Sequence, residues 1–437
     1  MPLRSQAHAV TLSSFAGGDF CFFPTNTNHE PRPRATTKAG RPRGLLTGHG
    51  TAGYVFKTMK VQVSVVRCEG YEYERVSEAV KESVGRLGGM GRFVKAGQKV
   101  LLKPNLLVSS TPQKGVTTHP MVVKAVIEMV KAAGGVPVVG DSPAVGTALR
   151  VAAKAGIAQV AEEAGCRVVD FREILRVRAP EGFIFRRFEV AREAVESDFV
   201  INLPKIKTHG QMLLTLGVKN MFGCVPGTRK AAWHLKAGVD RTYFARMLVE
   251  LYSTLKPGLT VMDGIVAMEG NGPSSGTARP LGMILAGTDC VALDSTVTHI
   301  LGLPRERLWT TQAAIECGIG VAAPELIEVL GPSLRELSVA PFKLPVAADL
   351  TWGVPGFIRG LVKDVLVPRP VIERSRCSEC LSCVKVCPPG AMKRGAGGIV
   401  IDRDRCIRCF CCQEVCPEGA IEIRSGFLHR VLRRGRQ

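Results

Sequence analysis

Eight cysteines near the C-terminus have a spacing that could support metal chemistry. The pattern C-x2-C-x2-C-x3-C-P spans Cys377 to Pro388 and repeats from Cys406 to Pro417, 29 residues further on. Four thiolates that converge from a tight loop suit a cubane iron–sulfur cluster. A zinc site and a disulfide framework are the alternatives. Zinc usually uses two C-x2-C pairs or adds histidine, and no histidine lies between these cysteines. A disulfide framework would be unusual in a chain this long without an export signal.

The repeat resembles the two-cluster bacterial ferredoxins. This resemblance implies two [4Fe-4S] clusters, with the fourth cysteine of each run binding the other cluster. The implied ligands are Cys377, Cys380, Cys383 and Cys416 for one cluster, and Cys406, Cys409, Cys412 and Cys387 for the other. Cys411 lies between two ligands and is predicted to be a thiol that binds no iron. Similar residues follow both runs, which indicates two duplicated halves.

The elements that would position other reactive groups lie upstream, where strands and helices alternate from residue 61 to about residue 331. Strands are predicted at 61–66, 99–103, 136–140, 167–170, 198–203, 259–262 and 281–286, and helices at 74–87, 120–133, 147–155, 157–164, 239–255 and 289–301. Most of the strands are continuous apolar runs, which is typical of a sheet buried on both faces. We predict an α/β fold with an open, mostly parallel sheet and helices on both faces, followed by a small α+β ferredoxin-like two-cluster domain.

Polar side chains follow four of the predicted strands. They are Lys103 and Asn105, then Asp141, then Lys205, Lys207 and His209, and then Asp263. Because the carboxyl ends of strands in an open α/β sheet face the ligand crevice, we expect a binding site there. The alternative is that the lysines reach solvent and the aspartates cap the next turns.

The segment after the strand 198–203 carries a concentration of positive charge. Pro204 is expected to turn the chain outward, and side chains alternate in an extended segment. Lys205, Lys207 and His209 would then share one face, where the two ammonium groups repel each other. An anion between them, such as a carboxylate or a phosphate, would remove that repulsion. A solvated basic edge is the alternative.

Two glycine-rich stretches, 217–223 and 269–276, could cradle an anion with backbone N–H groups. Neither matches the P-loop or the dinucleotide-binding fingerprint, so each could also be an ordinary loop.

The region 61–331 resembles domain-of-unknown-function family 362, in which this α/β unit often adjoins a two-cluster ferredoxin module. The motifs that carry the resemblance are Lys103-Pro104-Asn105, Thr118-His119-Pro120, Asp141-Ser142, Leu203-Pro204-Lys205-x-Lys207-Thr208-His209, Lys219-Asn220-x-Phe222-Gly223, Met268-Glu269-Gly270-Asn271-Gly272-Pro273 and Asp289-x2-Ala292-x-Asp294. The resemblance implies the architecture and the cofactor but no reaction. The candidate substrate-binding residues are Lys103, Asn105, Asp141, Lys205, Lys207, His209, Lys219, Asn220, Asp263 and Glu269.

Composition divides the rest of the 437-residue chain. We predict a disordered or mis-assigned extension at 1–58, the α/β domain at 59–331, a Pro-rich linker at 332–370, the ferredoxin domain at 371–425 and a basic tail at 426–437. The formal net charge is +20, but aromatic residues make up only 6%, which disfavours a nucleic-acid partner. No apolar run is long enough for a transmembrane helix, and the cytoplasm is the expected location.

The sequence therefore predicts an iron–sulfur oxidoreductase. Electrons would pass between the ferredoxin module and a substrate or cofactor in the α/β domain, because fusion holds the electron carrier beside its partner site. The expected partners are a redox protein or a small-molecule anion. The alternative is a non-enzymatic electron carrier or cluster-transfer protein whose α/β domain docks a partner.

Overall fold

A computed structural model of the chain describes residues 60–238, 240–339, 341–345 and 368–424. These residues all belong to one compact unit, Lys57–Gln437. The predicted extension at 1–58, the tail at 426–437 and most of the predicted linker lie outside the described residues. Among the residues described, no helix is long and apolar enough to cross a membrane.

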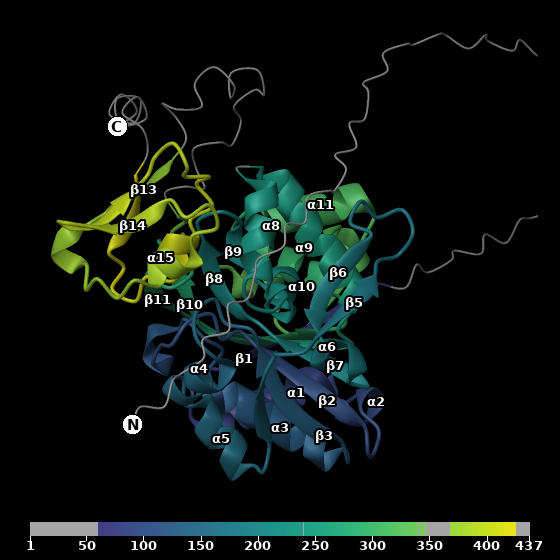
Figure 1. Cartoon of the computed structure of the whole chain (residues 1–437). Helices are drawn as coiled ribbons and strands as arrows, with labels where there is room; N and C mark the ends of the chain where they lie inside the picture. The colour runs from purple at the N-terminus through teal and green to yellow at the C-terminus, as the bar shows by residue number, and fades with distance from the viewer. Residues whose placement is uncertain (1–59, 239, 340, 346–367, 425–437) are drawn as a thin grey trace, which may run out of the picture. The chain divides into compact units, whose positions relative to one another are not determined.

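The α/β region is built on one mixed sheet (Figure 1). In the described residues its main path runs through β12 (Ile327–Leu330), β1 (Val61–Arg67), β11 (Thr277–Gly287), β10 (Leu259–Glu269), β7 (Phe199–Leu203), β2 (Lys99–Pro104), β3 (Val136–Asp141) and β4 (Arg167–Asp170). Strands β10, β7, β2, β3 and β4 are parallel neighbours, whereas β11 is antiparallel to both β1 and β10. The predicted α/β fold with a mostly parallel sheet is confirmed.

Helices cover both faces of this sheet (Figure 1). One core contains residues of α1 (Tyr73–Gly85), α3 (Pro120–Ala132), α4 (Ala148–Lys154) and α5 (Ile157–Glu163), and a second contains residues of α9 (Arg241–Leu255) and α11 (Trp309–Cys317). Along β2, Val100 and Leu102 enter the first core and Leu101 enters the second. Because successive side chains of a strand point to opposite faces, a continuous apolar run serves both cores.

Local capping sets where several helices begin. The predicted helix 239–255 begins at Arg241, because the side chain of Asp240 accepts a hydrogen bond from the Tyr243 backbone N–H. Helix α10 (Cys290–Ile300) begins after Asp289, whose side chain accepts hydrogen bonds from the backbone N–H groups of Val291 and Ala292.

The segment after Pro204 does not turn outward, so that prediction was wrong. Residues Lys205–His209 form β8, a fully buried strand that is parallel to β10 and antiparallel to β9 (Leu213–Thr215). Although Pro204 has no N–H group, its carbonyl accepts a hydrogen bond from the Asp263 backbone N–H at 2.9 Å, so the contact with β10 continues across the proline.

The described residues directly after 331, at 332–339 and 341–345, pack against the α/β region. Helix α12 (Leu334–Leu337) has a capping box, and Leu337 and Phe342 are buried in the core beside α10. The sequence did not predict the hairpin of β5 (Ile174–Arg178) and β6 (Arg187–Ala191).

The C-terminal module is a small α+β unit. Strand β13 (Arg369–Ile372) pairs with β16 (Ile421–Arg424), and β14 (Met392–Gly395) pairs with β15 (Gly398–Ile401), in each case antiparallel. Two short helices, α15 (Ser382–Val386) and α16 (Cys411–Glu414), occupy equivalent positions in the two halves of the cysteine repeat.

Candidate functional site

A cavity of about 430 Å³ lies at the carboxyl ends of β2 and β3, and we call it the central cavity. Its walls also include residues of β8, of α7 (Gly217–Asn220) and of α8 (Arg229–Ala237). The C-terminal module contributes Lys385, Val386, Cys411, Glu414 and Val415. The cavity is therefore bounded by both the α/β region and the cysteine-rich module, and its size suits a small molecule.

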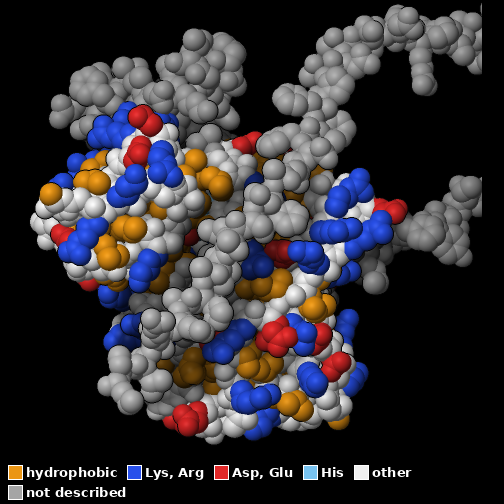
Figure 2. Space-filling model, viewed as in Figure 1, with side chains coloured by type: hydrophobic (Ala, Val, Ile, Leu, Met, Phe, Trp, Pro, Cys, Tyr) orange, Lys and Arg blue, Asp and Glu red, His pale blue; other side chains and the backbone are white. Residues whose placement is uncertain are grey.

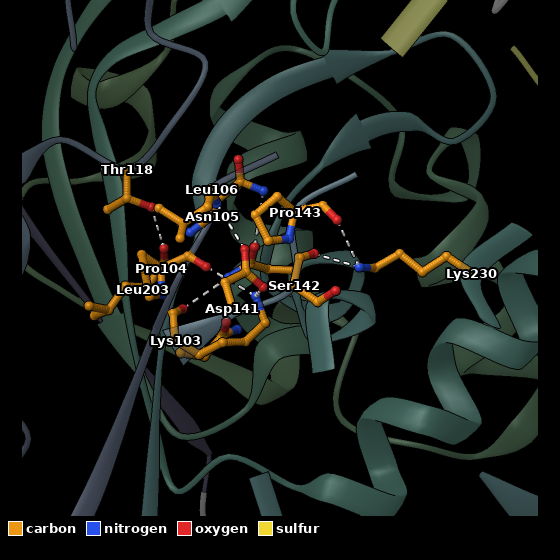
Figure 3. A network of polar contacts seen from close by, with 12 residues as sticks. Lys103, Pro104, Asn105, Leu106, Thr118, Asp141, Ser142, Pro143, Leu203 and Lys230 are labelled. Atoms are coloured by element: carbon orange, nitrogen blue, oxygen red, sulfur yellow. Dashed lines mark hydrogen bonds and ion pairs between the residues drawn. The ribbon is translucent and has the colours of Figure 1, made fainter. Parts of the chain in front are cut away.

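A buried ion pair lies on the β2–β3 side of the cavity (Figure 3). Lys103 Nζ is 2.9 Å from Asp141 Oδ1, and both side chains are almost completely buried. Asp141 Oδ2 also accepts a hydrogen bond from the Leu106 backbone N–H at 2.9 Å. A Cβ at Gly223 would lie 2.0 Å from Asp141 Oδ1, so only glycine allows this close approach. Because the two charges neutralise each other, this pair adds no net charge to the cavity.

Lys207 is completely buried, and the two oxygens to which its ammonium group donates are both uncharged. Its Nζ donates to Asn105 Oδ1 at 2.8 Å and to the Val116 carbonyl at 2.6 Å. Asn105 donates in turn to Asn220, and Asn220 donates to Asn202, so a chain of amides fixes the lysine. Burial, followed by the nearby charge of Lys219, holds the pKa of Lys207 well below its ordinary value.

His209 connects the α/β region with the C-terminal module. Its Nδ1 accepts hydrogen bonds from the backbone N–H groups of Gln211 and Met212, both at 3.1 Å. Nε2 therefore carries the proton in the neutral ring, and it lies 2.8 Å from Glu414 Oε1. Burial lowers the pKa of His209 to about 4, so the ring is neutral at physiological pH.

Three further basic side chains reach the cavity from α7 and α8. Lys230 Nζ donates to the carbonyls of Ser142 and Pro143 (Figure 3), and burial lowers its pKa to about 7. Burial likewise lowers the pKa of Lys219. It also lowers the pKa of His234, to about 4. The cavity can therefore change its positive charge near neutral pH.

Two buried polar atoms in the cavity wall have neither a hydrogen-bond partner nor an ion-pair partner among the described protein atoms. They are Thr215 Oγ1 and His234 Nδ1. Buried polar groups are normally satisfied, so these atoms are available to water or to a ligand. The aromatic rings of Phe171 and Phe222 supply an apolar part of the wall.

The structure brings seven of the ten predicted substrate-binding residues together around this cavity. They are Lys103, Asn105, Asp141, Lys207, His209, Lys219 and Asn220. Sequence reasoning did not single out Lys230, His234 or Thr215, which lie on elements without a distinctive local motif. The carbonyl contacts of Lys230 appear only when α8 is folded against the Ser142–Pro143 loop.

Three predicted residues lie elsewhere. Lys205 Nζ is 2.7 Å from Asp263 Oδ2 and donates to the Tyr71 hydroxyl at 2.6 Å, in a separate buried cluster. The prediction that Lys205 shares one face with Lys207 and His209 was wrong. The reason is a shift in the β8–β10 register, which pairs Lys205 with Asp263 but Lys207 with Met268. Glu269 instead accepts a hydrogen bond from the Lys343 backbone N–H.

The eight cysteines of the repeat form two sets in space. Cys377, Cys380, Cys383 and Cys416, here the first set, line one small pocket. Cys387, Cys406, Cys409 and Cys412, here the second set, line another. In the described residues no group of His, Cys, Asp or Glu side chains is arranged to hold a metal ion. A cubane differs from a mononuclear site because each of its four irons binds only one cysteine sulfur, so the four cysteine sulfurs surround a larger volume.

The loops around both sets have the same unusual backbone. Glu379 and Leu381 in the first half, and Arg408 and Phe410 in the second, have positive φ angles of 51–61°. In each half the two residues lie directly before and directly after the second cysteine of the run, Cys380 or Cys409. Where left-handed residues alternate with right-handed ones, successive backbone N–H groups point into a shared concavity. Such a concavity favours the binding of an anion. A non-glycine residue in this conformation costs about 1–2 kcal/mol, so its recurrence in both halves fits loops shaped around anionic clusters.

Helix α16 fastens the second half of the module to the α/β region. Besides the contact between Glu414 and His209, Gln413 Nε2 donates to the carbonyl of Asn271 at 2.9 Å. Ser274 Oγ donates to the Gln413 carbonyl at 3.4 Å. Gln413 and Glu414 are both buried, so these contacts are shielded from water.

Comparisons with known proteins agree with this division of the chain. Residues 100–299 match the family model described as domain of unknown function DUF362, and residues 369–417 match the model of a 4Fe-4S dicluster domain. A thylakoid-associated protein of Synechocystis sp. is 42% identical over 310 residues, which cover 71% of this chain and 96% of that protein.

A solved structure, the lactate racemase apoprotein of Thermoanaerobacterium thermosaccharolyticum, is 16% identical to the chain. The match covers 54% of this chain and 56% of that one with a TM-score of 0.34, which is too low a similarity to support a conclusion. The identity and coverage of the Synechocystis protein, together with the two family models, show that this iron–sulfur protein belongs to the DUF362 family and combines the family's domain with a 4Fe-4S ferredoxin domain.

Proposed function

We propose that the protein is an iron–sulfur oxidoreductase that exchanges electrons between two [4Fe-4S] clusters and a small-molecule anion in the central cavity. The observation that carries this proposal is the composition of the cavity wall. Lysine side chains at or after strand ends of the α/β region border the central cavity, and so do residues of the cysteine-rich module. A ligand there would be held beside the redox module.

The two cysteine sets would supply the ligands of the two clusters. The first set would hold one cluster and the second set the other, and the inward N–H groups of both loops would offset their negative charge. The Ala391 and Ala420 backbone N–H groups donate to Cys387 Sγ and Cys416 Sγ, at 3.1 Å and 3.2 Å. When bound, the clusters supply one-electron transfer.

The residues of the cavity fit an anion better than a cation. The wall contains three carboxylates: Asp141 is ion-paired with Lys103, Asp170 is ion-paired with Arg172, and Glu414 lies against the neutral ring of His209. Lys207, Lys219 and Lys230 have no carboxylate within ion-pair distance among the contacts of the described residues. Lys207 can bind an acidic group, Thr215 can orient it, and the wall of Phe171 and Phe222 excludes water from the apolar part.

The alternative is a non-enzymatic electron carrier or cluster-transfer protein that docks a redox partner through the α/β domain. A pure carrier needs no internal cavity, so the cavity favours the enzyme. A nucleic-acid partner remains disfavoured, because the Lys and Arg side chains on the face in Figure 2 are interspersed with acidic and apolar ones. We also propose a cytoplasmic location. Since the Synechocystis relative is named for its association with thylakoids, recovery of this chain in the membrane fraction would replace that proposal.

The cluster part is tested by purification without oxygen. We expect about eight iron atoms per chain, as two four-iron clusters require, and an electron paramagnetic resonance signal after reduction. Replacing Cys383 should remove one cluster, whereas replacing Cys411 should leave the iron content unchanged. Bound zinc without iron would contradict the assignment.

The substrate part is tested by untargeted mass spectrometry of small molecules that co-purify with the protein. An anionic ligand should be present in the parent and in a control with exposed Lys393→Met, and absent from the double variant Lys207→Met/Lys219→Met. Its oxidation state should change when the parent is reduced chemically. If the double variant retains the ligand, the site lies elsewhere. A ligand whose oxidation state stays constant would favour the carrier.

A further inference from the structure

Two residues in equivalent positions of the repeat each lie beside a cysteine sulfur. Ser382 directly precedes the third cysteine of the first run, and Cys411 directly precedes the third cysteine of the second. The side chains of Cys380 and Ser382 are hydrogen-bonded, with Sγ and Oγ 3.4 Å apart. The side chains of Cys409 and Cys411 line the same pocket and interact with each other there. When Cys380 and Cys409 bind iron as thiolates, Ser382 and Cys411 are left as the donors in these contacts.

The surroundings of these two donors differ. Cys411 lines both the pocket of the second set and the central cavity. Ser382 lines the pocket of the first set, and none of the residues of that pocket borders the central cavity. The Ser382 hydroxyl therefore borders only the pocket of the first set, whereas the Cys411 thiol borders both the pocket of the second set and the central cavity.

The position of Cys411 relative to the cavity is fixed by its own helix. Glu414 and Gln413 of α16 contact His209 and Asn271 of the α/β region. A Cβ at Gly210 would lie 2.9 Å from Ile423 Cδ1, so the two regions are tightly packed at this point. An independent observation favours a ligand in the cavity, because the buried Thr215 hydroxyl in its wall has no partner among the described residues.

A hydrogen bond to a ligand sulfur stabilises the extra negative charge of a reduced cluster and raises its reduction potential. The S–H group is a weaker donor than O–H, so Cys411 should have a smaller effect than Ser382. A positive charge close to the sulfur acts in the same direction. Lys219 can supply such a charge, because it borders the cavity together with Cys411 and interacts electrostatically with it.

We propose that Cys411 is a positioning residue that couples the second cysteine set electrostatically to the contents of the central cavity, while Ser382 serves the first set without such coupling. The cavity charge then tunes one of the two cluster sites and leaves the other unaffected. This inference rests on the proposed function only in taking the two cysteine sets as cluster ligands.

The test is a redox titration of the full chain without oxygen, followed by electron paramagnetic resonance and iron analysis. Cys411→Ala should shift the midpoint of one signal to more negative potential, and Cys411→Ser should shift the same signal to more positive potential than the parent. Ser382→Ala should shift the other signal to more negative potential. Lys219→Met should shift only the signal that responds to residue 411, and Lys219→Arg should restore it.

Each outcome decides the proposal. Signals that do not respond to residue 411, or that respond equally to residues 382 and 411, would overturn it. A shift of the Ser382-dependent signal in Lys219→Met would do the same, as would loss of iron in Cys411→Ala, which would make Cys411 a ligand. The titration needs no substrate, so a protein without enzymatic activity could still show these shifts. If the shifts were absent while the ligand still bound, only this inference would fail.

Discussion

The two halves of the cysteine repeat have nearly the same local sequence and backbone but different surroundings. In the first half Cys380 is exposed, and Glu379 and Ser378 beside it are exposed as well. In the second half Cys409 and Phe410 are buried, and α16 packs against the α/β region. A repeat can therefore preserve a metal site while its outer surface diverges. The first half is the more exposed of the two, and the second half supplies Cys411, Glu414 and Val415 to the cavity wall beside Lys385 and Val386 of the first.

The largest expected difference between the halves follows from removing equivalent ligands. Cys380→Ala and Cys409→Ala should each lower the iron content from about eight to about four atoms. Only Cys409→Ala should loosen α16, because this helix begins two residues later and carries the contacts with His209 and Asn271. We expect hydrogen exchange in α16 and β8 to rise about tenfold, equivalent to ~1.4 kcal/mol of local opening free energy. Equal exchange in the two variants would contradict the comparison.

A smaller difference, in the free energy of unfolding, should appear when Lys385 of α15 and Glu414 of α16 are replaced, because the two residues occupy equivalent positions. Glu414→Ala leaves the buried N–H group of His209 without its acceptor and should cost about 1–3 kcal/mol of unfolding free energy. Lys385 is exposed, so Lys385→Ala should change it by less than about 0.5 kcal/mol. Thermal unfolding without oxygen measures both. Glu414→Gln keeps an acceptor, so its loss of unfolding free energy should lie between those of Glu414→Ala and Lys385→Ala. A Glu414→Ala protein as stable as the parent would show that α16 is not held by this contact.

The smallest effect concerns the pH dependence of the cavity lysines. Burial lowers the pKa of Lys230 to about 7, so its positive charge is present below that pH and is lost as pH rises through it. The affinity of the cavity for an anion should decrease over the same range. Competitive acetylation with mass spectrometry should give a midpoint near this value for Lys230, with exposed Lys393 of the C-terminal module as the reference. Identical midpoints for the two lysines would mean that the cavity is open to water.

Much of the fold could be predicted from periodicity. Continuous apolar runs such as the strand at 99–103 predicted a sheet covered on both faces, and β2 supplies residues to the cores on both sides. The sequence did not predict the antiparallel position of β11 between β1 and β10. Strand order and direction depend on contacts between distant segments. An apolar run does not indicate whether its strand is parallel or antiparallel to its neighbours.

The candidate site was only partly predictable. The rule that polar groups gather at the carboxyl ends of strands correctly indicated that Lys103, Asn105 and Asp141 lie together. It could not separate Lys205 from Lys207, because their divergence depends on how β8 pairs with β10. Nor could it show that α8 brings Lys230 to the Ser142–Pro143 loop.

By itself the sequence determined the two cysteine runs, since the spacing of cluster ligands is local and a loop of about a dozen residues supplies most of them. Only the tertiary structure decided which half of the repeat is buried against the α/β region. The cause is the packing of α16 against β8 and the loop at Asn271, which are more than a hundred residues away along the chain. Burial in that interface sets the charge state of His209 and its neighbours, because the loss of water around a side chain depends on the whole fold.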